Sequence, residues 1–237
     1  MKCKYLLGLH IKLKYLAQVT DFSTVRHRRV SSMYRINRYL QTLIVAFVIV
    51  ALNGCGSPKL DPIGDGGTIL AFGDSLTVGV GTSKTNSYPS VLEELTKLNV
   101  INSGVSGETS DIGLKRFTKE MDRVFPDLVI LIEGGNDILQ NRNHSEIEEN
   151  IKGMIEIAVS RGVPVVLIGI PAKNLFSSSA PFYEELAEQF QLVFDGTLIG
   201  SLQRSPQLKS DHVHFNKKGY RKMAEAIYEL LQENGAL

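Results

Sequence analysis

A short apolar run that ends at a Gly-Asp-Ser turn constrains the fold of this chain more than any other feature. The run Ile69–Phe72 holds four apolar residues without interruption, which is typical of a strand buried on both faces of a parallel sheet. Gly73 ends the run, and Asp74 and Ser75 follow directly. Ligands of open α/β sheets bind at the carboxyl ends of the strands, so Ser75 is a candidate nucleophile. In that role it needs a base, an orienting acid and oxyanion donors.

Apolar runs alternate with amphipathic segments from Thr68 to the C-terminus, which is the pattern of an α/β sheet. The predicted strands are Thr68–Phe72, Val100–Asn102, Leu128–Ile132, Val163–Ile170 and Leu192–Phe194. We expect a three-layer α/β/α sandwich with a mostly parallel five-stranded sheet.

Polar residues mark the starts of several predicted helices. Asp111 and Asn216 are expected N-caps, and Ser145-Glu-Ile-Glu148 has the pattern of a capping box. The expected helices cover Tyr88–Lys97, the segment from about Asp111, the segment from Ser145 to Gly162, Pro181–Gln191 and the residues after Asn216.

Four short blocks in this region resemble those of a known enzyme superfamily. The blocks are Gly73-Asp74-Ser75-Leu76, Ser106-Gly107-Glu108-Thr109, Gly134-Gly135-Asn136-Asp137 and Asp211-His212-Val213-His214. In this order and spacing they resemble the SGNH hydrolases, the GDSL lipase/esterase superfamily, from about Thr68 to the C-terminus. The wider second block, Ile101–Ser110, is most similar to the bacterial thioesterase/lysophospholipase/arylesterase branch. The resemblance implies the flavodoxin-like SGNH hydrolase fold.

The resemblance also implies a role for one or more residues of each block. Ser75 is the implied nucleophile, His214 the base that takes its proton, and Asp211 the acid that orients the imidazole. The family spacing of three selects His214 over its neighbour His212. The backbone N–H groups of Ser75 and Gly107 and the side-chain amide of Asn136 are the implied oxyanion-hole donors. This chemistry requires no cofactor.

Each of these residues has an ordinary structural explanation as well. Serine after a strand often caps a helix, and Asp211 could form an Asx-turn ahead of an exposed histidine. Gly107 could be a turn glycine and Asn136 a turn residue of its loop. These explanations do not account for the position of both Gly107 and Asn136 after successive strands.

Three other acidic residues lie near the predicted site. Asp74 is expected to accept backbone N–H bonds that hold the serine loop. Glu108 and Glu133 receive no role from any motif.

By this resemblance the chain is a serine esterase or thioesterase that hydrolyses acyl esters, of arylesterase, lysophospholipase or acyl-thioesterase type. The alternatives are a carbohydrate O-acetylesterase of the same fold and a non-catalytic envelope lipoprotein that binds a glycan or a protein. A long apolar groove favours acyl chains, and a shallow polar cleft favours acetylated sugars. Four residues could line such a groove or could be ordinary packing: Leu175, Phe176, Phe182 and Tyr183.

The composition excludes several other classes of function. A formal net charge of +1 and a hydrophobic fraction of 43% describe an ordinary globular protein and make no electrostatic case for nucleic acid. The two cysteines cannot form a disulfide framework. Asp211, His212 and His214 include a His-x-His pair, but zinc sites need three or four ligands, usually with more His or Cys. We therefore expect no metal.

The N-terminal region is expected to lie outside the folded domain. Leu43–Leu52 is an uncharged run of ten residues, which is short for a membrane span and typical of a signal-peptide hydrophobic region. Arg35 and Arg38 supply its positive flank. A single transmembrane anchor with a basic cytoplasmic arm is the alternative, because Leu40–Leu52 is nearly continuous.

The residues after this run resemble a bacterial lipobox, Leu52-Asn-Gly-Cys55, and make Cys55 the expected site of lipidation. The leader has ordinary length when it is counted from Met33, so residues 1–32 are attributed to an upstream start choice. Stable anchoring needs more than one acyl chain, which lipoprotein processing supplies. Because Gly56 is not an aspartate, we expect a bacterial envelope protein on the outer membrane, facing the periplasm. The predicted organisation is an extension and signal peptide over 1–54, a tether over 55–67 and the hydrolase domain over 68–237.

Overall fold

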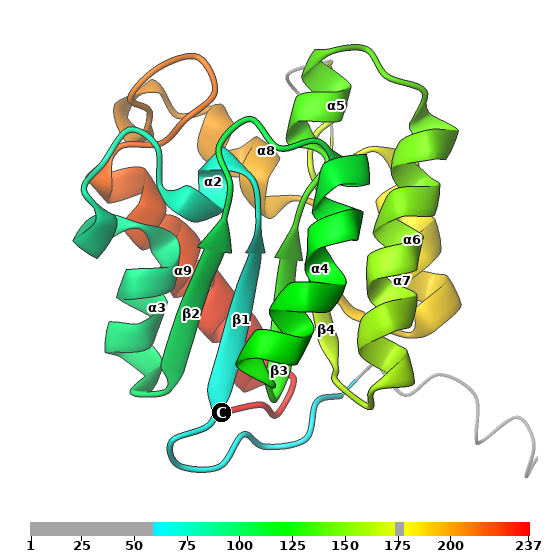
Figure 1. Ribbon diagram of the computed structural model, residues 1–237. Coiled ribbons are helices and arrows are strands. Elements are labelled where there is room, and N and C mark those ends of the chain that lie inside the picture. The colour runs from blue at the N-terminus through cyan, green and yellow to red at the C-terminus, as the bar shows by residue number, and fades with distance from the viewer. Residues whose placement is uncertain (1–58, 174–177) are drawn as a thin grey trace, which may run out of the picture. The chain divides into compact units, whose positions relative to one another are not determined.

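The computed structural model describes residues 59–173 and 178–237, which form a layered α/β unit (Figure 1). Its five strands lie in the order β2-β1-β3-β4-β5, and every neighbouring pair is parallel. The strands are β1 (Thr68–Gly73), β2 (Asn99–Gly104), β3 (Leu128–Ile132), β4 (Val165–Ile168) and β5 (Val193–Asp195). Because β1 and β3 are adjacent, the segments that follow them leave the same edge of the sheet side by side.

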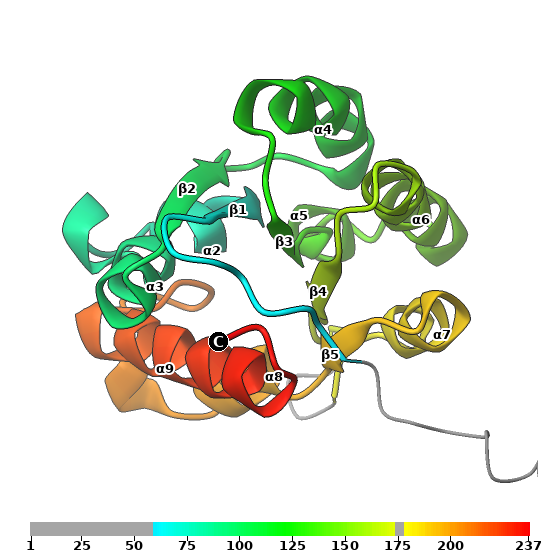
Figure 2. The same ribbon diagram turned by 90° about the horizontal axis from the view of Figure 1, so that it is seen from below.

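Helices cover both faces of the sheet, which confirms the predicted three-layer α/β/α sandwich. Figure 2 shows α3 and α9 on one face and α4, α6 and α7 on the other. The helices are α2 (Ser75–Val78), α3 (Tyr88–Thr96), α4 (Ser110–Val124), α5 (Gly135–Leu139), α6 (His144–Ser160), α7 (Pro181–Phe190), α8 (Leu198–Gln203) and α9 (Lys217–Glu233).

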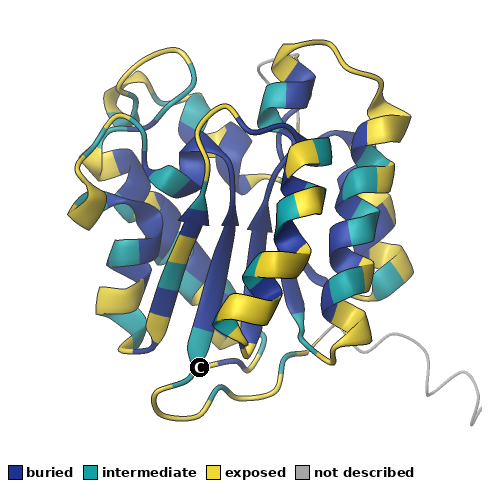
Figure 3. Ribbon diagram, in the orientation of Figure 1, coloured by how far each residue is buried: buried dark blue, intermediate teal, exposed yellow. Residues whose placement is uncertain are grey.

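The core lies between the sheet and both helical layers (Figure 3). All residues of β3 and all but the first of β1 are buried, as a strand covered on both faces requires. On one side of the sheet the Phe72 ring meets the Phe117 ring of α4 edge to face, at 4.8 Å between centroids. A rigid centre of this kind fixes the carboxyl ends of β1 and β3.

The predicted strands are all present, and β3 has the predicted bounds. Three short helices were not predicted: α2, α5 and α8. They have four to six residues, too few to display a helical period in the sequence.

Two predicted helix caps were wrong and one was right. The α6 cap is Asn143, whose side chain accepts the Ser145 N–H, so Ser145 lies inside the helix. The α4 N-cap position is held by Thr109, and Asp111 lies in the first turn. Asn216 caps α9 as predicted, because its side chain accepts from the N–H groups of Lys218 and Gly219.

The folded unit begins earlier than the predicted boundary at Thr68. Leu60 N–H donates to the Asn234 carbonyl at 2.8 Å, and Ile63 N–H donates to the Ala236 carbonyl at 2.9 Å. The Leu60 and Ile63 side chains also pack against the core. The part of the predicted tether that the structure describes is therefore held against the folded unit at Leu60 and Ile63.

Several predicted features lie outside the described residues. These are the Leu43–Leu52 run, the lipidation site Cys55 and the loop residues Leu175 and Phe176. No helix within the described ranges is long and apolar enough to cross a bilayer.

Candidate active site

The serine loop joins β1 to α2 in a tight turn. A side chain at Gly73 would bring its Cβ atom within 2.0 Å of the Ile132 carbonyl oxygen, so the close pairing of β1 and β3 requires glycine there. Asp74 is the N-cap of α2, and its Oδ1 accepts the Leu76 N–H at 2.9 Å, as predicted. This bond holds Ser75 at the first position of the helix, at the carboxyl edge of the sheet.

Asp211 and His214 lie on the loop that precedes α9. His214 Nδ1 is 2.8 Å from Asp211 Oδ2, and His214 Nε2 is 3.0 Å from Ser75 Oγ. Although 139 residues separate them in sequence, the serine and the histidine thus lie within hydrogen-bond distance. The three predicted side chains form one continuous hydrogen-bonded row.

The Asp211 carboxylate is held in its charged form by the loop that carries it. The His214 N–H bond, the His214 ring and the Val213 N–H keep the pKa of Asp211 well below its usual range. Both backbone bonds are 2.8 Å long and end on Oδ1, which leaves Oδ2 for the imidazole. The carboxylate can therefore hold one ring nitrogen in its protonated form.

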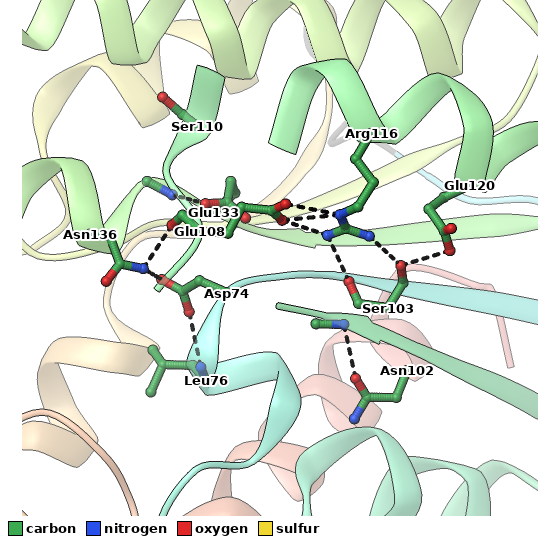
Figure 4. A network of polar contacts seen from close by, with 12 residues as sticks. Asp74, Leu76, Asn102, Ser103, Glu108, Ser110, Arg116, Glu120, Glu133 and Asn136 are labelled. Carbon is green, nitrogen blue, oxygen red and sulfur yellow. Dashed lines mark hydrogen bonds and ion pairs between the residues drawn. The ribbon is translucent and has the colours of Figure 1, made fainter. Parts of the chain in front are cut away.

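The other predicted donors lie on the segments that follow the neighbouring strands, Gly107 in the loop after β2 and Asn136 in the first turn of α5. Asn136 Nδ2 donates to the Glu108 carbonyl at 2.7 Å and lies 3.4 Å from Asp74 Oδ2 (Figure 4). Gly107 precedes Glu108 in an exposed turn and has φ of +80°, a conformation that favours glycine. The Asn136 amide thus joins α5 to the loop that follows β2.

A cavity of about 360 Å³ opens beside Ser75 and Asn136. Most of its lining is apolar and comes from α5 and from the loops after β4 and before α9. The apolar side chains include Ile138, Leu139, Ile170, Pro171, Ala172 and Val213. His212 and Lys173 also line it, whereas Gly107 does not.

The sequence left open whether Phe182 and Tyr183 line a groove or are ordinary packing. Phe182 and Tyr183 do not line the cavity, because both are buried in the core. Their ring centroids lie 4.3 Å apart. The Tyr183 hydroxyl donates to the Glu133 carbonyl. For these two residues the ordinary packing explanation is correct.

Glu133 is a fully buried carboxyl group behind the site. Its Oε1 accepts the Gly134 N–H at 3.1 Å, and its Oε2 has no hydrogen-bond partner among the described residues. Burial raises the pKa of Glu133 well above its usual range, and the nearby Asp74 carboxyl raises it further. The carboxylic acid is therefore the favoured form of this side chain.

Sequence reasoning missed Arg116, which lies on α4 and binds Glu108 through two nitrogens. No clear signal in the sequence distinguishes it, because Lys115 stands directly beside it between Leu114 and Phe117. As for metals, no group of three or more His, Cys, Asp or Glu side chains in the described part of the chain could hold an ion.

Comparison with known proteins shows the family to which the chain belongs. A model of the GDSL-like lipase/acylhydrolase family matches residues 71–222. An arylesterase of Vibrio mimicus is 34% identical over 174 residues, which are 69% of this chain and 87% of that protein. Thioesterase 1/protease 1/lysophospholipase L1 of Escherichia coli (strain K12) is 25% identical over 173 residues, 70% of this chain and 83% of that protein. The solved structure of AlinE4, an SGNH-hydrolase family esterase, has a TM-score of 0.57 at 32% identity and covers 72% of this chain and 97% of its own.

The five-stranded parallel sheet with helices on both faces is the fold of the SGNH hydrolases. The chain belongs to the GDSL-like lipase/acylhydrolase family and is a hydrolase that acts on esters.

Proposed function

We propose that this protein is a serine esterase or thioesterase that hydrolyses acyl esters through an acyl-enzyme. Ser75 is the nucleophile, His214 the general base and Asp211 the orienting acid. The observation that carries the proposal is the row of hydrogen bonds from Ser75 Oγ through His214 to Asp211, at 3.0 and 2.8 Å. A serine hydroxyl is a weak nucleophile unless a base takes its proton, and this row supplies the base and its orientation.

In the first half of the reaction, Ser75 Oγ attacks the substrate carbonyl while its proton moves to His214 Nε2. Asp211 keeps the proton on Nδ1, so Nε2 is the nitrogen free to accept. The positive charge that develops on the ring is stabilised by the carboxylate 2.8 Å away. His214 then protonates the leaving alcohol or thiol, and water releases the acyl group by the reverse sequence.

The oxyanion of the tetrahedral intermediate is stabilised by the backbone N–H groups of Ser75 and Gly107 and by Asn136. One Asn136 N–H is engaged by the Glu108 carbonyl at 2.7 Å. The other faces Asp74 Oδ2 at 3.4 Å, which is long for a hydrogen bond, and is available to an oxyanion. Loss of one such donor typically lowers the rate by ~10²–10³.

The apolar cavity beside Ser75 favours acyl chains over acetyl groups. Its volume of about 360 Å³ is far larger than an acetyl group needs, and Ile138, Ile170 and Val213 offer no hydrogen bond to a sugar. The names of the relatives, arylesterase and thioesterase/lysophospholipase, agree with a substrate of this class. A carbohydrate O-acetylesterase is the second candidate, and chain-length preference separates the two.

The experiment compares the form beginning at Gly56 with its Ser75→Ala variant. Both are treated with a fluorophosphonate probe and assayed on p-nitrophenyl acetate, butyrate and decanoate. We expect labelling and turnover only with Ser75, and higher kcat/KM on butyrate or decanoate than on acetate. Preference for acetate would favour the acetylesterase. A folded wild type that neither labels nor turns over would instead support the non-catalytic binding protein.

We further propose that Cys55 is lipidated and anchors the protein in the bacterial envelope. In this proposal the protein is attached to the outer membrane and faces the periplasm. The lipobox-like Leu52-Asn-Gly-Cys55 after an uncharged run supports this proposal. Metabolic labelling with a palmitate analogue tests it, with Cys55→Ser as the control. Equal labelling of both proteins would refute lipidation at Cys55 without bearing on the esterase proposal.

A further inference from the structure

Arg116 ties the end of β2 to the loop that follows it. Its Nε and Nη2 donate to the Glu108 carboxylate at 2.9 and 2.6 Å, and its Nη1 and Nη2 donate to the Ser103 hydroxyl and carbonyl at 2.6 and 3.1 Å. The guanidinium also stacks on the Phe72 ring, 4.1 Å from its centroid. All three guanidinium nitrogens are thus engaged in hydrogen bonds (Figure 4).

Glu108 carries this restraint to the proposed oxyanion hole. Its carboxylate is almost completely buried, with 1% of the side chain exposed, and Arg116 is its ion-pair partner. Its backbone carbonyl accepts the Asn136 amide at 2.7 Å, and its backbone N–H closes a turn onto Val105 at 3.2 Å. Gly107 lies inside that turn. The position of Glu108 therefore sets the position of both Gly107 and Asn136.

From these contacts we infer that Arg116 is a positioning residue for catalysis: through Glu108 it fixes the Gly107 N–H and the Asn136 amide where the oxyanion forms. The inference rests on the oxyanion assignment of the proposed function. Preorganised donors act only when they are held at the correct distance, and a displacement of about 1 Å can lower a rate by ~10². Glu108 is held by charge and by geometry, because a buried carboxylate without its cation is costly.

The guanidinium group is necessary for this task and a positive charge alone does not suffice. Lysine can neutralise Glu108, but its compact ammonium lacks the planar fork with which the guanidinium reaches both carboxylate oxygens and the Ser103 carbonyl. Arg116→Lys therefore keeps the ion pair and loosens the turn. The substitution separates loss of geometry from loss of charge.

The test measures kcat and KM on p-nitrophenyl butyrate for wild type and Arg116→Lys, with the reactive sites counted by fluorophosphonate labelling. It also measures inhibition by an alkyl boronic acid, which forms a tetrahedral anionic adduct with a nucleophilic serine. We expect kcat per site to fall roughly tenfold or more while KM changes less than about twofold. The boronic acid inhibition constant should rise by the same factor as kcat/KM falls, because both report the tetrahedral state.

Arg123→Lys is the matched control. Arg123 lies on the same helix and is exposed, and its ion pair, at 2.6 Å, is with Glu120 rather than with Glu108. We expect its kinetics to be those of wild type. Should Arg116→Lys fold poorly, Glu108→Gln keeps the side-chain shape and one acceptor oxygen, and a fall in kcat per site is expected there as well.

A double-mutant cycle with Asn136→Ala decides how Arg116 acts. If Arg116 works through the oxyanion donors, the two substitutions together should lower kcat by less than the product of their single effects. If the two effects on kcat multiply, the inference is overturned. It is also overturned if Arg116→Lys lowers the melting temperature while kcat per site stays constant. If Asn136→Ala lowers kcat and Arg116→Lys does not, only this inference fails. If Asn136→Ala has no effect, the oxyanion assignment fails with it.

Discussion

Asp74 is a buried carboxyl group directly before the proposed nucleophile, with 3% of its surface exposed. Burial raises its pKa to about 6, although the Leu76 N–H bond and the nearby His214 oppose the shift, and the Asp137 carboxyl adds to it. The folded state thus binds a proton at Asp74 more tightly than the unfolded chain does. The contribution of Asp74 to the free energy of unfolding therefore becomes less favourable as the pH rises from about 4 through 6. Above pH 6 the full cost of ionising the buried carboxyl group is present.

Asp74→Asn should remove this pH dependence. Asparagine keeps the oxygen that accepts the Leu76 N–H and carries no charge. Relative to wild type, the free energy of unfolding of the variant should rise between pH 4 and pH 7 by about 3 kcal/mol, since one pKa unit corresponds to about 1.4 kcal/mol. Urea denaturation of both proteins across this range measures the difference. A difference that stays constant with pH would show that Asp74 has an ordinary pKa.

At the scale of elements, the start of α9 supports the loop that carries Asp211 and His214. The Asn216 side chain accepts from two N–H groups of the first turn and donates to the carbonyls of Gln207 and Lys209, at 2.9 and 3.1 Å. Its backbone N–H donates to the Leu208 carbonyl at 2.9 Å. One residue therefore caps the helix and closes the loop in front of it.

Asn216→Asp should weaken the loop and keep the cap. Aspartate retains the acceptor oxygen but loses both donors, and its second oxygen faces the two carbonyls. We expect the free energy of unfolding to fall by about 1–3 kcal/mol and kcat to fall, because the His214 ring loses its fixed position. Asn143→Ala is the control: it removes the α6 cap at a cost of about 1 kcal/mol and should leave kcat unchanged. Equal kcat values for wild type and both variants would contradict this role of Asn216.

At the scale of the whole molecule, the two ends of the sheet strands in the described part of the chain have different roles. Ser75 lies just beyond the carboxyl end of β1. Residues 59–67 precede the first residue of β1, and Leu60 and Ile63 bind the C-terminal residues at the opposite edge (Figure 1). Gly67 also accepts the Asn99 N–H at 3.0 Å, so this segment extends the start of the sheet. Its contribution is to stability, and the chemistry lies a full strand length away.

A form that begins at Thr68 should be less stable than one that begins at Gly56 and equally active per folded molecule. It loses the packing of Leu60 and Ile63 and their backbone bonds to the C-terminus. We expect the free energy of unfolding to fall by about 2–4 kcal/mol. Thermal melts and kcat per labelled serine measure the two effects. Equal melting temperatures would mean that residues 56–67 act as a free tether.

The sequence by itself determined the fold class, the strand positions and the serine, histidine and aspartate that the fold brings together. These features are carried by local patterns: apolar runs for buried strands, and short blocks whose spacing resembles a known family. Only the tertiary structure decided that Asn143 caps α6, that Leu60 and Ile63 pack against the core, and that the cavity lining includes Ile138, Ile170 and Val213. The same holds for the contact of Arg116 with Glu108. Such contacts depend on which side chains meet across elements, and a one-dimensional pattern does not contain that information until the backbone is placed in space.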